Sequence, residues 1–108
     1  MQKANNWEPN DPFILTTLGM ARYRTGAYEP GLNALTTAAK LRADKGAPAD
    51  LTCTAFTAMT LHQLGRDEAA QSSLERLRAL LQDERFANDG WAKALVAEAE
   101  KLIGSKKP

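Results

Sequence analysis

One pattern occurs twice in this chain at a fixed offset, and it limits the possible folds more than any other feature. A shift of 39 residues brings these pairs into register: Asp11 with Asp50, Met20 with Met59, Tyr23 with His62, Gly26 with Gly65, Glu29 with Glu68, Gly31 with Ala70, and Leu35 with Leu74. Most of the pairs are identical, and one combines two small residues. Such a period is typical of repeat proteins, in which each copy is one supersecondary unit that stacks on the next. The chain is therefore expected to contain two copies of one unit.

Each copy carries the capping signals of two helices joined by a short turn. Asp11 is a typical N-cap, and Pro12 follows at the first helical position, where its missing N–H is not needed. Gly26 is a typical C-terminal stop, and Gly65 repeats it in the second copy. No alternating run bounded by an Asn-Gly or Asp-Gly turn indicates a strand pair. The sequence predicts five helices, at about residues 12–24, 28–43, 51–64, 67–82 and 91–103.

Small residues stand where the two helices of a unit are expected to approach each other. A side chain at Gly19 would collide with the second helix, and Gly31 and Ala70 leave room from the other side. Gly26 and Gly65 permit the turn between helices at little steric cost, because they have no Cβ. These glycines are therefore predicted to shape the fold and not to bind phosphate.

Two stretches resemble the tetratricopeptide repeat, whose pattern is Leu-Gly, an aromatic residue, Gly-x-Tyr and then a small residue. The first is "LGMARYRTGAYEPGLNAL" at residues 18–35, and "LHQLGRDEAAQSSL" at residues 61–74 is similar to the second half of another copy. The second copy departs from the pattern, with Thr57-Ala58 where the first has Leu18-Gly19. The chain is also similar to the terminal repeats of large bacterial multidomain signalling proteins.

The resemblance implies an all-α fold of tetratricopeptide-like hairpins, an alpha-alpha superhelix. Since the family repeat is about 34 residues, the longer offset implies about five extra residues in one connection. The expected organisation is a single domain, 1–108, with repeat 1 at about 11–44, an insert at about 45–49, repeat 2 at about 50–83 and a C-terminal capping helix at about 90–103. Pro9-Asn10-Asp11 resembles the tail of a preceding repeat.

The charge balance gives no support for a nucleic-acid or membrane partner. Lys and Arg total 14 against 13 for Asp and Glu, so the formal net charge is +1 and no basic stripe is present. No stretch approaches the ~20 apolar residues of a membrane span, and the N-terminal residues lack a signal-peptide core. A single cysteine, Cys53, is consistent with a reducing compartment. A cytoplasmic location is expected.

Catalytic and metal-binding groups are not indicated. Cys53 and His62 are the candidates for a thiol–imidazole pair, but nine residues of helix turn through about 900° and place them on opposite faces. Cys53 is predicted to be a small buried apolar residue, and one cysteine with one histidine does not make a zinc site. Asp67 and Asp83 stand at helix starts, where acidic residues favour the helix dipole. No enzymatic activity, metal or cofactor is expected.

The resemblance places a partner-binding groove on the first helix of each hairpin. The implied groove residues are Phe13, Thr16, Thr17, Met20 and Tyr23 in the first copy and Thr52, Ala55, Phe56, Met59 and His62 in the second. The same apolar stripes are also compatible with a simple core. Family members that bind acidic tails use lysine, arginine and asparagine side chains on these faces. The predicted groove residues of this chain include none of these three residue types. Trp7 and Trp91, which flank the repeats, are predicted to be packing residues.

Two functions remain open from the sequence. The first is a non-catalytic interaction module that holds a peptide or partner segment in an apolar groove. The second is a structural spacer or self-association element of a larger protein, with contact between chains through the N-terminal hairpin. An independent array usually needs about three repeats. The smaller number expected in this chain supports the second function.

Overall fold

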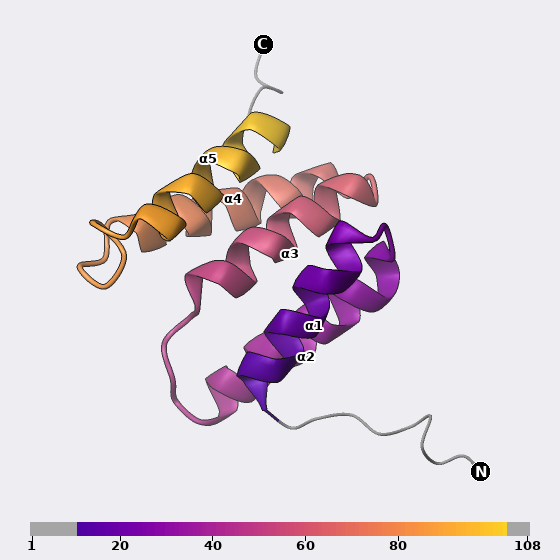
Figure 1. Ribbon diagram of the computed structural model, residues 1–108, viewed down its shortest axis with the longest axis horizontal. Helices are drawn as coiled ribbons and strands as arrows, with labels where there is room; N and C mark the ends of the chain where they lie inside the picture. The colour runs from indigo at the N-terminus through magenta and orange to yellow at the C-terminus, as the bar shows by residue number, and fades with distance from the viewer. Residues whose placement is uncertain (1–10, 104–108) are drawn as a thin grey trace.

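The computed structural model describes residues 11–103, and in this range the chain contains helices and no strand. The five helices are α1 (Pro12–Arg24), α2 (Tyr28–Asp44), α3 (Leu51–Gln63), α4 (Asp67–Leu81) and α5 (Gly90–Ile103) (Figure 1). The predicted all-α class is confirmed, and every predicted helix boundary agrees with the structure to within one residue. Residues 9 and 10, which resemble the tail of a preceding repeat, lie outside the described range, as does Trp7.

The predicted capping residues begin and end the helices. The Asp11 carboxylate accepts a hydrogen bond from the Phe13 N–H at 2.9 Å, and the Asp50 carboxylate accepts one from the Cys53 N–H at 2.9 Å. Gly26 and Gly65 have φ angles of 86° and 79°, a left-handed conformation in which a Cβ is strained. The two turns have equivalent hydrogen bonds. In the first, the Gly26 N–H donates to the Tyr23 carbonyl and the Ala27 N–H to the Arg22 carbonyl. In the second, the Gly65 N–H donates to the His62 carbonyl and the Arg66 N–H to the Leu61 carbonyl. Both are the Schellman motif that satisfies the last carbonyls of a helix.

The helices pair as two hairpins, α1 with α2 and α3 with α4. Helices α1 and α3 begin at Pro12 and Leu51, and α2 and α4 begin at Tyr28 and Asp67, so both pairs of starts are 39 residues apart. Gly19 allows the close contact within the first hairpin, because a Cβ there would lie 2.5 Å from Leu35 Cγ. In the second hairpin, small side chains at Ala58 and Ala70 are fully buried.

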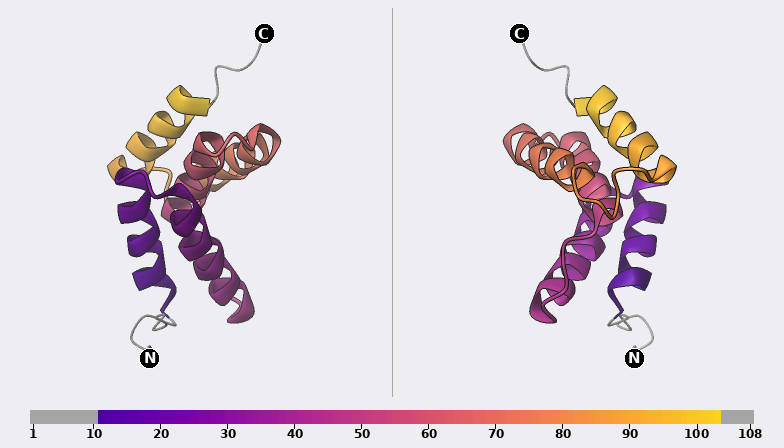
Figure 2. Two further views of the ribbon diagram at one scale, coloured as in Figure 1. Left: turned by 90° about the vertical axis from the view of Figure 1, so that its right-hand side faces the viewer. Right: turned by 90° about the vertical axis from the view of Figure 1, so that its left-hand side faces the viewer.

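Helix α3 lies at the centre of the molecule and contacts all four other helices. Its buried residues therefore extend around much of the helix: Leu51, Cys53, Ala55, Phe56, Ala58, Met59 and Thr60. Helix α5 packs against α3 and α4 through a buried stripe that includes Leu95 and Ala99. Figure 2 shows α1 and α5 on one side of the molecule and α2 and α4 on the other.

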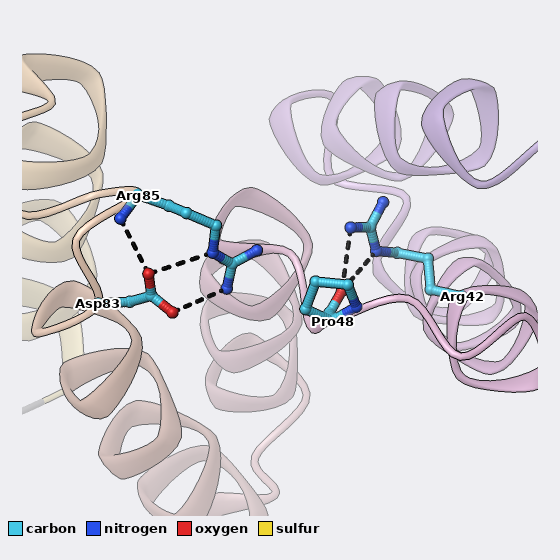
Figure 3. Close-up of polar contacts among 4 residues, drawn as sticks. All are labelled: Arg42, Pro48, Asp83 and Arg85. Carbon is cyan, nitrogen blue, oxygen red and sulfur yellow. Dashed lines mark hydrogen bonds and ion pairs between the residues drawn. The ribbon is translucent and has the colours of Figure 1, made fainter.

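Side chains fix the two longer connections. Between α2 and α3, Arg42 donates from Nε and Nη2 to the Pro48 carbonyl at 3.1 and 2.9 Å (Figure 3). Asp83 was expected at a helix start but lies in the connection after α4, and its carboxylate accepts hydrogen bonds from the backbone N–H and the guanidinium of Arg85 (Figure 3). These bonds to the Arg85 side chain and backbone lower the pKa of Asp83 below its usual value. Each connection thus contains hydrogen bonds made by an arginine side chain.

Candidate functional site

A pocket opens between α1 and the start of α3, and we call it the α1–α3 pocket. Its volume is about 120 Å³. The residues that line it are Phe13, Thr16, Thr17, Met20, Arg42, Asp50 and Thr52. Helix α1 supplies four of these residues because their spacing places them along one face of the helix. Arg42 in the last turn of α2, the N-cap Asp50 and Thr52 in the first turn of α3 line the other side.

Five of the ten predicted groove residues meet at this pocket: Phe13, Thr16, Thr17, Met20 and Thr52. Phe13 is 75% exposed, so its ring stands almost free at the pocket rim. Met20 and Thr52 are half-buried, and Thr16 lies at the bottom, with 7% of its surface exposed. The pocket therefore combines residues from both copies of the repeated pattern.

The other five predicted groove residues do not line the pocket. Tyr23 is 9% exposed, and Ala55, Phe56 and Met59 are fully buried, so these four belong to the core instead. Helix α5 packs against α3, and aromatic rings from α1, α2 and α3 contact one another. The Tyr23 ring lies 5.6 Å from both Tyr28 and Phe56, between centroids. The groove interpretation thus has to be corrected for these four residues, since their side chains are closed off from a partner.

His62, the last predicted groove residue, lies half-buried near the end of α3. Its Nδ1 atom is 3.9 Å from an Asp67 carboxylate oxygen, which makes an ion pair only when the imidazole is protonated. This contact joins α3 to the start of α4 and is local to the second hairpin.

An ion pair that the sequence pattern did not indicate joins the first and last helices. Arg24 at the end of α1 donates to both carboxylate oxygens of Glu98 on α5, at 2.7 and 3.2 Å. The hydrogen bond to Glu98 raises the pKa of Arg24 above its usual value. No local signal could have identified this pair, because its partners are far apart in sequence and meet only when α1 and α5 both pack beside α3.

Trp91 was predicted to be a packing residue, and this prediction is wrong. Its side chain is 53% exposed at the start of α5, and its indole N–H donates to Thr52 Oγ1 at 3.2 Å. Thr52 also lines the α1–α3 pocket. Trp91 therefore places a large, partly exposed ring next to the pocket residues.

The polar groups of the pocket are mostly occupied by contacts within the protein. Arg42 is bound to the Pro48 carbonyl, and Asp50 caps α3. Thr17 Oγ1 donates to the Phe13 carbonyl at 3.0 Å, and Thr52 accepts from Trp91. What the pocket offers a ligand is therefore mainly the apolar surface of Phe13, Met20 and the threonine methyl groups.

Cys53 is buried, as predicted. It is 3% exposed, and its Sγ lies 3.3 Å from the Leu35 carbonyl oxygen, to which the thiol donates. Burial raises the pKa of the Cys53 thiol, which keeps it in the neutral form that does not act as a nucleophile. The thiol is thus a packing group between α2 and α3.

Comparisons of the chain with protein-family models, with curated proteins and with solved structures found no match. Within residues 11–103, no helix has both the length and the apolar character needed to cross a membrane. The same range holds no group of three or more His, Cys, Asp or Glu side chains suited to a metal ion. Two larger pockets in this range, of about 150 and 260 Å³, are lined by none of the predicted groove residues, whereas the α1–α3 pocket is lined by five of them.

Proposed function

We propose that this chain is a non-catalytic protein-interaction module of tetratricopeptide-like hairpins, and that it binds a peptide or other segment of a partner protein at the α1–α3 pocket. The observation that supports the proposal most is the meeting of Phe13, Met20 and Thr52, which come from the two copies of the repeated pattern, around one opening. The two hairpins at a constant offset and the buried small residues between their helices support the family resemblance.

The size of the pocket favours a side chain over a whole small molecule. Pockets for drug-sized ligands usually have volumes of about 300–1,000 Å³, and this one is about 120 Å³. An apolar side chain of a partner segment would fill it, while neighbouring parts of the segment would cover Phe13. Met20 is a suitable contact because its flexible thioether adapts to different shapes.

Phe13 offers a partner a large exposed apolar surface. Its ring is 75% exposed, and full burial of such a side chain contributes about 1.5–3 kcal/mol. A difference of this size corresponds to about tenfold or more in affinity. Phe13→Glu is therefore expected to weaken binding of a partner by at least about tenfold.

The chain offers a matched control at the next residue. Ile14 is 45% exposed on α1 but does not line the pocket. A partner captured with the full chain should be measured by isothermal titration calorimetry against the wild type, Phe13→Glu and Ile14→Glu. Loss of affinity with Phe13→Glu alone would support the proposal. Equal affinity for all three proteins would exclude the α1–α3 pocket as the binding site.

The alternative function is self-association, as a spacer in a larger protein. It is favoured by the small number of hairpins, because fewer than about three repeats are usually not stable alone. Ile14, which is 45% exposed on the first hairpin outside the pocket, is the residue at which this alternative can be tested. Light scattering coupled to size-exclusion chromatography would show a concentration-dependent increase in mass that Ile14→Glu abolishes. A constant monomer mass would exclude this alternative.

A further inference from the structure

The ion pair between Arg24 and Glu98 lies one helical turn from the α1–α3 pocket, and we call it the clasp. Arg24 follows the pocket residue Met20 by four positions on α1, and Phe56 follows the pocket residue Thr52 by four positions on α3. Residues four apart are neighbours on the same helix face. The clasp and Phe56 therefore continue the surface on which the pocket opens.

The clasp closes this surface over Phe56. The Arg24 guanidinium carbon lies 5.1 Å from the centroid of the Phe56 ring and 5.7 Å from that of Tyr23. Phe56 has no exposed surface, although its position on α3 belongs to the predicted groove face. Glu98 on α5 holds the guanidinium in this place because its carboxylate oxygens accept two hydrogen bonds from Arg24.

We propose that the clasp is a gate: when the contact between Arg24 and Glu98 breaks, Arg24 moves away and Phe56 joins the apolar surface of the α1–α3 pocket. The structure then represents the closed form, in which only the outer half of the predicted groove is accessible. This inference rests on the proposed function, because it concerns how much of the same surface a partner can reach. A partner that covers the longer surface stabilises the open form.

The exposure of the ion pair makes opening inexpensive. The side chains of Arg24 and Glu98 are 52% and 41% exposed, so water can solvate both charges when they separate. Exposed pairs contribute little to stability and are weakened by salt. The aromatic rings below the guanidinium add a cation–π contribution, which favours the closed form. A ligand can open the gate only if the closed form is favoured by a small free energy, and these contacts give such a modest preference.

The test is hydroxyl-radical footprinting of the full chain, with the modification of Phe56 measured by peptide mass spectrometry. The central variant is Glu98→Gln, which removes the charge that holds Arg24 but leaves Arg24 in the chain. Modification of Phe56 is expected to increase by about two- to fivefold, the range that an exposed ion pair accounts for. Raising the salt concentration should increase modification in the wild type and have little effect on Glu98→Gln.

Two controls separate opening of the gate from loss of the fold. Arg78→Gln breaks the 2.8 Å ion pair between Arg78 and Glu100, which also ties α5 to the rest of the molecule, and should leave Phe56 protected. Leu74, which is fully buried on α4, reports global unfolding and should not change.

Two outcomes would overturn the gate. One is unchanged protection of Phe56 in Glu98→Gln, which would show that Arg24 stays over Phe56 without the ion pair. The other is an equal increase at Phe56 and Leu74, which would make the clasp a support of the whole fold. No partner is present in this experiment, so its failure is distinct from a failure of the binding test with Phe13→Glu.

Discussion

At the scale of single residues, the backbone conformation of two glycines shapes both hairpins. Gly26 and Gly65 have φ angles of 86° and 79°, and a Cβ built on either meets no atom within 4 Å. Space is therefore available at both positions, and the restriction comes from the backbone alone. Only glycine adopts this region at little cost, so the two turns depend on it.

We expect Gly26→Val and Gly65→Val each to destabilise the chain by about 1 kcal/mol or more, because a β-branched residue is strained at positive φ. Urea unfolding followed by circular dichroism measures the change. Gly90→Ala is the matched control, since a Cβ at Gly90 also meets no atom within 4 Å and its φ is not positive. Unchanged unfolding midpoints for both valine variants would contradict the role of the φ angles.

At the scale of the helices, packing within the first hairpin depends on a glycine facing a leucine. A Cβ on Gly19 would lie 2.5 Å from Leu35 Cγ and 3.2 Å from the Gly31 carbonyl oxygen. Leu35 is fully buried, so a Cβ at Gly19 would force it to shift within the core. The distance between α1 and α2 is therefore matched to the absence of a side chain at Gly19.

We expect Gly19→Ala to destabilise the chain by about 1–3 kcal/mol, the range for overpacking a core. A double-mutant cycle tests the cause. In the Gly19→Ala background, Leu35→Ala should cost less than in the wild type, because it also removes the clash. Additive effects on the urea unfolding free energy would show that the two side chains do not compete for the same space.

At the scale of the whole molecule, α5 completes the burial of the second hairpin. It packs against α3 and α4, and Leu95, Val96, Ala99 and Ile103 are buried there, while Lys93 and Lys101 face solvent. The apolar face of α5 adds to the core around α3 and α4, and its opposite face is exposed to solvent.

We expect Leu95→Ala to lower the free energy of unfolding by about 2–5 kcal/mol, the range for deleting a large buried side chain. Lys93→Ala on the exposed side of α5 should change it by no more than about 0.5 kcal/mol. Urea unfolding of both variants gives the comparison. A small effect of Leu95→Ala would mean that α5 is not part of the cooperative core.

The sequence alone determined the helices, because their signals are local. These signals act within one or two helical turns: the N-caps Asp11 and Asp50, the turn glycines and the period of the leucines. The structure contains the caps and the turns as predicted. The close approach at Gly19 could also be predicted, because the second helix of a hairpin is only a short turn away.

Only the tertiary structure decided which residues of the predicted groove face are exposed. Phe56 and Met59 have the same helical spacing as the pocket residues, yet they are fully buried, while Trp91 is exposed. These outcomes depend on where α5 packs and on Arg24 reaching Glu98, and both contacts join segments that are distant in sequence. Helical periodicity tells which residues share a face, but the burial of that face depends on the element that covers it.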